Sequence, residues 1–222
     1  MNARYIIIKT ILTNGRFEMY ERNNVIRQFE TTIAKHCGAP YGVAVESCTA
    51  ALFLSCLCLK VHEVTIPKKT YFSVPMAIRH AGGTVRYEDR RWQGAYQLQP
   101  YPIIDSAMKF QKNMFLAGSL HCLSFHYAKH IPIGRGGMIL TDSKKARDWF
   151  RVMRNDGRRE IPKEKDRVKL LGWNMYMTPE QAARGLALYY WRIHNQPDQP
   201  DLKMTHGDIS CLPMNMQSTT NY

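Results

Sequence analysis

Hydrophobic residues recur along this chain in two alternating patterns, one with the spacing of a helix and one with the content of a buried strand. Val25, Ile26, Phe29 and Ile33 lie at helical spacing and predict an amphipathic helix that ends at Gly38. The same reasoning predicts, in order, strand 41–45, helix 50–59, strand 63–66, helix 73–81, strand 84–87, strand 101–105, two strands on either side of a loop within 121–141, helix 142–154 and helix 178–194. This alternation indicates an α/β fold with a mainly parallel sheet flanked by helices.

The linker between the third and fourth predicted strands is short. It spans residues 89–101 and contains Gly94 and Pro100. A parallel crossover needs a dozen or more residues and usually a helix, which glycine and proline disfavour. We therefore expect no full helix there. Either the crossover is reduced to a coil, or the two strands are not neighbours in the sheet.

Length and composition fit one compact domain. The chain has 222 residues, of which 45% are hydrophobic and 22% charged, a balance that excludes a wholly disordered protein. We expect the compact domain over residues 1–194. The three prolines and weak periodicity of residues 195–222 predict a poorly ordered tail or an arm that docks on a partner. No apolar run reaches the roughly twenty residues of a membrane span, so we expect a cytoplasmic protein without membrane contact.

The charge balance favours an anionic partner. Lys plus Arg number 31 against 18 Asp plus Glu, a net charge of +13, which suits a phosphorylated small molecule or a nucleic acid. Between Lys144 and Lys169 there are eleven Lys or Arg against five Asp or Glu. This basic run is open to three interpretations: a solvated face, a clamp for the diphosphate of a nucleotide-linked sugar, or a nucleic-acid track.

Cysteine and histidine spacings do not predict a metal site. The six cysteines lie mostly in apolar runs and form no CxxC pair, so we expect reduced core thiols. His126 and His130 are four residues apart, a spacing that binds metal only on a helix, and here they flank a predicted loop.

Lys129 is the residue whose position most clearly suggests a catalytic role. It follows the apolar run 120–125 and precedes the glycine-rich turn 134–137. Lysine is costly to bury as a cation, so this one either reaches water from a surface loop or serves as a near-neutral amine, as a Schiff-base lysine does. The stretch alone does not decide between the two.

Other polar residues along the chain match one cofactor. A polar turn ending at Thr49 precedes a helix, Tyr71 follows a threonine, Asp105 ends a strand, and Ser124 comes five residues before Lys129. A pyridoxal 5'-phosphate site needs such parts: donors at a helix N-terminus for the phosphate, a ring to stack on the pyridine, a carboxylate for its nitrogen and an amine for its aldehyde.

In the residues of its motifs and in their order, the chain resembles the DegT/DnrJ/EryC1/StrS family of sugar aminotransferases, which are fold type I pyridoxal phosphate enzymes. The similarity covers residues 16 to about 190. The matching segments are Phe29-Glu30, Val43 to Leu52, Glu63 to Pro67, Thr70-Tyr71-Phe72, Ala81-Gly82-Gly83, Ile104 to Ala107, Cys122 to Lys129, Gly134 to Gly137, Asn174 and Gln181-Ala182-Ala183.

The resemblance implies a role for each candidate residue. Lys129 would be the catalytic Schiff-base lysine, Asp105 would pair with the pyridine nitrogen, and Tyr71 would stack on the ring. The remaining cofactor contacts implied are Thr49 with the backbone N–H of Ala50, Ser124, and Asn174, which would reach the cofactor of the partner subunit in a homodimer. The implied fold is the large domain of an aspartate aminotransferase-like transferase.

The implied activity moves an amino group from an amino acid, expected to be glutamate, to a nucleotide-linked keto-sugar. The chain departs from the family pattern between the third strand and Asp105, where a strand and a helix are missing, and in the small C-terminal domain, which is largely missing. Two alternatives stay open: a pyridoxal phosphate enzyme that acts on a nucleic-acid base, suggested by the +13 charge, and a degenerate, non-catalytic dimeric scaffold.

Overall fold

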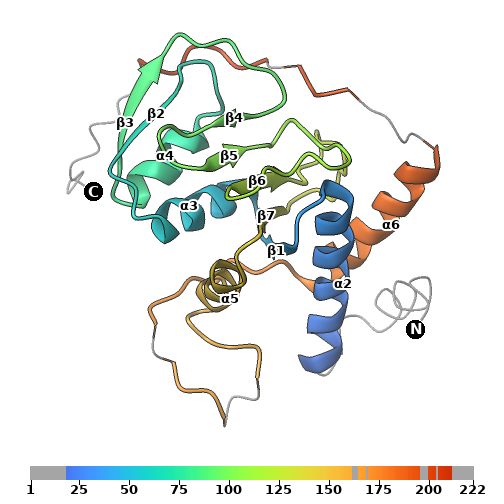
Figure 1. Cartoon of the computed structure of the whole chain (residues 1–222). Helices are drawn as coiled ribbons and strands as arrows, with labels where there is room; N and C mark the ends of the chain where they lie inside the picture. The colour runs from blue at the N-terminus through green and yellow to red at the C-terminus, as the bar shows by residue number, and fades with distance from the viewer. Residues whose placement is uncertain (1–18, 162–164, 169, 196–199, 204, 212–222) are drawn as a thin grey trace, which may run out of the picture.

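The computed structural model describes residues 19–161, 165–168, 170–195, 200–203 and 205–211 (Figure 1). Its strands are β1 (Tyr41–Val45), β2 (Glu63–Pro67), β3 (Thr84–Glu88), β4 (Tyr96–Gln97), β5 (Ile103–Asp105), β6 (Leu120–Ser124) and β7 (Gly137–Thr141). Its helices are α2 (Met19–Cys37), α3 (Cys48–Cys58), α4 (Ser73–His80), α5 (Lys144–Met153) and α6 (Pro179–Asn195).

The strands form a five-stranded sheet in the order β1-β7-β6-β5-β4 and a parallel pair, β2-β3. Thr65 of β2 and Gln99, just after β4, exchange backbone hydrogen bonds of 2.9 and 3.1 Å, which join the two sheets edge to edge. β1, β2, β3, β5 and β6 run in one direction, whereas β4 and β7 run against it. The α/β fold and the mainly parallel strand direction predicted from the sequence are therefore confirmed.

Helices cover both faces of the sheet, and each face has its own hydrophobic core (Figure 1). One core lies under α3, α4 and α5, and the other under α2 and α6. Because successive strand residues point to opposite faces, Val43 and Val45 enter the first core and Ala44 enters the second. A sheet covered on both faces explains why most residues of its central strands are apolar and why β7 is buried along its whole length.

Helix ends follow the signals in the sequence. Ser47 caps α3 by accepting a hydrogen bond from the Ala50 N–H, at 3.1 Å. At α6, Thr178 and Gln181 form the expected capping box, with each backbone N–H donating to the other side chain. Gly38 follows α2 with a φ of +78°, a conformation that glycine adopts without strain.

Residues 89–101 contain no helix, as expected. Of the two alternatives, the second is correct: β3 and β5 are not neighbours, because β4 and the residues after it lie between β5 and β2. β4 pairs antiparallel with β5 through a tight connection, so this part of the sheet needs no crossover helix.

The described residues of the C-terminal tail lie against the same chain. The Leu202 N–H donates to the Met108 carbonyl and the Ile209 N–H to the Lys68 carbonyl, both at 2.9 Å. In Figure 1 this red segment passes along the sheet edge near β2 and β3. The division at residue 194 into a domain and a tail stays a prediction.

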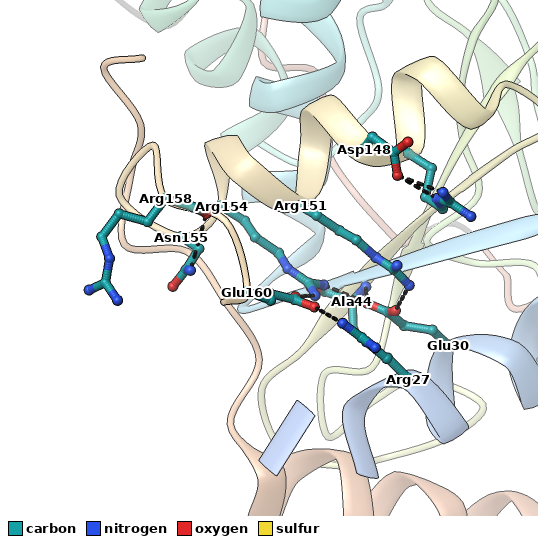
Figure 2. A network of polar contacts seen from close by, with 10 residues as sticks. Arg27, Glu30, Ala44, Asp148, Arg151, Arg154, Asn155, Arg158 and Glu160 are labelled. Atoms are coloured by element: carbon teal, nitrogen blue, oxygen red, sulfur yellow. Dashed lines mark hydrogen bonds and ion pairs between the residues drawn. The ribbon is translucent and has the colours of Figure 1, made fainter. Parts of the chain in front are cut away.

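A buried network of charges ties α2, β1 and α5 together (Figure 2). Glu30 of α2 accepts hydrogen bonds from the Ala44 N–H at 2.9 Å, from Arg151 at 2.7 Å and from Arg154 at 2.5 Å. Arg154 also donates to the Ala44 carbonyl and, at 2.8 Å, to Glu160. Burial acts to lower the pKa of Arg154, but the carboxylates of Glu30 and Glu160 raise it.

Two further expectations concern thiols and membranes. All six cysteines fall within the described residues, and all are free, with Cys37, Cys56 and Cys122 buried. Among the helices of the described ranges, none has the length and apolar content that crossing a membrane requires.

Candidate active site

A cavity of about 490 Å³ opens where β1, β2, β5 and β6 end. The carboxyl ends of strands that run in one direction meet at one edge of a sheet, which is where open α/β sheets bind ligands. Residues far apart in the chain meet there. The lining includes Thr49, Tyr71, Asp105, Ser124 and Lys129, so the structure brings five of the seven predicted site residues together.

Hydroxyl groups gather at the end of the cavity formed by two helix N-termini. Thr49, in the first turn of α3, and Ser73, the first residue of α4, are joined by a hydrogen bond of 2.8 Å between their side-chain oxygens. Ser124 ends β6, and its Oγ accepts from the His126 N–H at 3.4 Å. Helix N-termini and hydroxyl donors together make a site for a phosphate group.

The N–H of Ala50, the predicted phosphate contact, donates to Ser47 Oγ in this structure, and the Ala50 side chain is buried outside the cavity lining. The first turn of a helix has further free N–H groups, and those of Cys48 and Thr49 have no hydrogen-bond partner in the described part of the chain. The contact of the Ala50 N–H with a phosphate stays a prediction.

Asp105 is the buried acid of the cavity, with 5% of its surface exposed. Burial raises the pKa of its carboxyl group, while hydrogen bonds from the Ala107 N–H and the Tyr96 hydroxyl and the charge of Lys129 act to lower it. The Ala107 bond is 3.0 Å long and orients the carboxyl at the end of β5. A carboxylate held in this way can pair with a cationic ring nitrogen.

Lys129 lies half-buried in the loop between β6 and β7, and its backbone N–H closes a turn with the His126 carbonyl at 2.9 Å. Its charge acts on both Asp105 and His206. Tyr71 is 46% exposed, and its ring lies 5.4 Å from that of His206. The amine, the acid and the aromatic ring therefore face one cavity.

Asn174 lies away from the cavity lining. Its side-chain amide donates to Asp156 at 3.2 Å, and its backbone bridges to Asn155. The expected contact with a partner subunit's cofactor stays a prediction.

The basic run 144–169 contributes no lining residue among its described positions. Arg151 and Arg154 instead pair with Glu30, and Arg159 pairs with Asp166 at 2.9 Å. Several described cations of the run therefore face acids of the same chain, and the diphosphate clamp stays a prediction. Arg135 and Lys203 are the cationic side chains that line the cavity besides Lys129.

Sequence reasoning missed several lining residues. Ser73 carried a signal, since it begins a predicted helix, and Arg135 lies in a glycine-rich turn. Trp92, Lys203 and His206 come from the irregular linker and the tail, where no periodicity marks them. Within the described ranges, no group of three or more His, Cys, Asp or Glu side chains gathers in a way that could hold a metal ion.

Comparison with known proteins fixes the family. The family model of the DegT/DnrJ/EryC1/StrS aminotransferases matches residues 4–101 and 109–189. The chain belongs to this family. The two matched blocks are separated by residues 102–108, which include Asp105 and follow the shortened linker.

Several known proteins are similar to this family member over most of its length. Spore coat polysaccharide biosynthesis protein SpsC of Bacillus subtilis is 25% identical over 72% of this chain. The crystal structure of 3-amino-5-hydroxybenzoic acid synthase superposes on 86% of the chain with a TM-score of 0.72 and 18% identity. PseC of Helicobacter pylori, an aminotransferase involved in the biosynthesis of pseudoaminic acid, superposes on 86% with a TM-score of 0.69 and 14% identity.

The chain covers only part of the length of these relatives: 55% of SpsC, and 61% and 62% of the two solved structures.

Proposed function

We propose that this chain is a pyridoxal 5'-phosphate-dependent aminotransferase that moves an amino group from an amino acid to a keto-sugar linked to a nucleotide, with glutamate as donor. The observation that carries the proposal is the meeting of Lys129, Asp105 and the hydroxyls of Thr49 and Ser124 at one cavity. Family membership and relatives named for amino-sugar and polysaccharide synthesis support the acceptor class.

The residues present fit the cofactor. Thr49, Ser73 and Ser124 would hold its phosphate at the positive end of α3, and Asp105 would pair with its ring nitrogen. Tyr71 would lie against the ring. When bound, pyridoxal phosphate supplies an aldehyde for the amino group and a ring that withdraws electrons from the substrate carbon.

The chain's own residues would supply positioning and proton transfer. Lys129 Nζ, as the free amine, would take the proton from the α carbon of the donor and return it during amination of the acceptor. Asp105, buried and fixed by the Ala107 N–H, would keep its negative charge beside the ring nitrogen. In the net reaction, amino acid and keto-sugar become keto acid and amino-sugar, so atoms and electrons balance.

Arg135 and Lys203 line the cavity and would meet the anionic parts of the substrates. The comparisons add no support for a nucleic-acid substrate. A homodimer and a cytoplasmic location stay predictions.

The test uses the purified full chain incubated with pyridoxal phosphate. We expect a long-wavelength absorbance band, and borohydride reduction should attach the cofactor to Lys129, as peptide mapping would show. Lys129→Ala should lose both signals, whereas Lys145→Ala, a control for an exposed lysine on α5, should keep both. A colourless wild-type protein, or attachment at another lysine, would refute the proposal.

A second measurement separates an enzyme from a non-catalytic scaffold. Glutamate added to the loaded protein should bleach the band and release 2-oxoglutarate. A band that persists with every amino acid tested would favour the scaffold.

A further inference from the structure

Tyr96 is placed directly opposite Asp105 by the short strand β4. The antiparallel register pairs Tyr96 with Asp105, so the two side chains leave the same face of the sheet, with their Cβ atoms about 5 Å apart. That face is the one covered by α3, where Tyr96 joins the hydrophobic core.

The hydroxyl of Tyr96 is enclosed and paired. Tyr96 is 5% exposed, and its oxygen lies 2.6 Å from Thr70 Oγ1, whose residue is 1% exposed. The Trp92 ring covers Tyr96 with its centroid at 4.7 Å, and the Trp92 indole N–H is anchored to the Lys69 carbonyl at 2.8 Å. The hydroxyl is therefore shielded from water and held in one place.

The chemistry of the groups sets the direction of the hydrogen bonds. Burial raises the pKa of Tyr96 well above its ordinary value, so the hydroxyl keeps its proton and can donate to the Asp105 carboxylate, which can only accept. The Tyr96 oxygen then accepts from the Thr70 hydroxyl. In such a chain each bond polarises the next.

Other titratable groups also face Asp105. Burial raises the pKa of the Cys48 and Cys122 thiols, which therefore stay neutral, and Lys129 contributes a positive charge from the loop after β6. Among these side chains, Tyr96 carries the buried neutral hydroxyl that can donate to the carboxylate set opposite it by the strand register.

We propose that Tyr96 is a positioning residue for Asp105, and that the chain from Thr70 to Tyr96 to Asp105 keeps the carboxylate ionised and aimed into the cavity. The pairing of this carboxylate with the ring nitrogen of a cofactor rests on the proposed function. The hydrogen bond itself can be tested in the protein without cofactor.

The decisive experiment follows the titration of Asp105 in the full chain by NMR of ¹³Cγ-labelled aspartate, with Asp105→Asn to assign the signal. Tyr96→Phe keeps the ring packing and removes the donor, so we expect the Asp105 midpoint to move to higher pH. Tyr87→Phe is the matched control on β3, because the buried Tyr87 hydroxyl has no partner among the described residues. An unchanged midpoint in Tyr96→Phe would overturn the proposal, as would an equal change in Tyr87→Phe.

A second variant covers the case in which Tyr96→Phe does not fold. Thr70→Val keeps the shape of the threonine and removes its hydroxyl, so it should raise the Asp105 midpoint in the same direction but by less. If this variant has the same Asp105 midpoint as the wild type, Thr70 does not belong to the hydrogen-bonded series, and the proposal as stated is overturned.

Cofactor binding gives the last readout. Titration with pyridoxal phosphate should show about ten- to hundredfold weaker binding to Tyr96→Phe than to Tyr87→Phe, the loss expected for one hydrogen bond to a charged partner. If the Asp105 midpoint moves but the wild-type protein takes up no cofactor, the hydrogen bond stands and the proposed function fails. Equal cofactor affinity in both variants would overturn the positioning role.

Discussion

Replacing Glu30 by glutamine should destabilise the protein far more than removing any exposed acid. Glu30 has 1% of its surface exposed and faces two guanidinium groups, Arg151 and Arg154, while it also accepts from the Ala44 N–H (Figure 2). Glutamine has nearly the same volume and its carbonyl can still accept from Ala44. Its amide NH₂, however, would take the place of Oε2 and face Arg151, so the change removes both the negative charge and one acceptor.

The magnitude follows from the burial of both partners. Removing one member of a buried ion pair leaves the other charge without compensation, which costs about 3–5 kcal/mol. Arg154 keeps Glu160 as a second partner, at 2.8 Å, so we expect the lower part of this range, about 3 kcal/mol. In a chain of 222 residues that corresponds to a fall in Tm of roughly 10 °C.

Urea unfolding followed by circular dichroism measures the effect, with Glu63→Gln as the matched control. Glu63 pairs with Arg86 at 2.7 Å, but their side chains are 54% and 69% exposed, so this pair should contribute under about 1 kcal/mol. Similar losses in Glu30→Gln and Glu63→Gln would refute the reasoning, because burial would then not govern the strength of the pair.

Two further predictions concern the surroundings of the cavity. Gly137→Ala should weaken both stability and binding of pyridoxal phosphate, because its new Cβ would lie 2.6 Å from the Cys48 backbone nitrogen at the start of α3. Gly207→Ala is the control, because open space surrounds this position, and it should change neither property. Burial, and to a lesser extent Lys109, lowers the pKa of His121 to about 4, and its Nε2 accepts from the Leu116 N–H at 3.2 Å. Since the folded pKa of His121 lies below the unfolded value of about 6.5, stability should fall as the pH drops from 6.5 towards 4, by about 2 kcal/mol at pH 5. The urea midpoints of His121→Gln should depend less on pH than those of the wild type.

The sequence was most informative where one residue type has one physical role. Ser47 and Thr178 cap the helices that follow them, and Gly38 ends a helix because it tolerates a positive φ. Asp105 and Lys129 carried signals because an acid at a strand end and a lysine beside an apolar run are both unusual. Such positions can be recognised without knowledge of their neighbours.

The parts that could not be predicted depend on tertiary neighbours. β4 has two residues, too few for any periodicity, and its effect comes from the register that sets Tyr96 against Asp105. The basic run could be counted, but the count did not show that Arg154 turns inward to Glu30. The sequence also did not show that the Ser47 hydroxyl accepts from the Ala50 N–H at the start of α3, because that depends on the geometry of the turn.

The two sides of the cavity differ in how firmly the fold holds them. Thr49 and Asp105 lie at the ends of elements fixed by the sheet and by a helix cap, so their positions depend on the whole core. Thr205 and His206 belong to the C-terminal tail. The tail is joined to the rest of the chain by backbone hydrogen bonds such as those of Leu202 and Ile209. Its ion pair between Asp208 and Lys68 is partly exposed and contributes little to stability. Substitutions in the tail should therefore change the substrate side of the cavity while they leave the phosphate end intact. The part of the site with sequence signals is the part proposed to bind the cofactor, and the part without them is the side on which substrates would be distinguished.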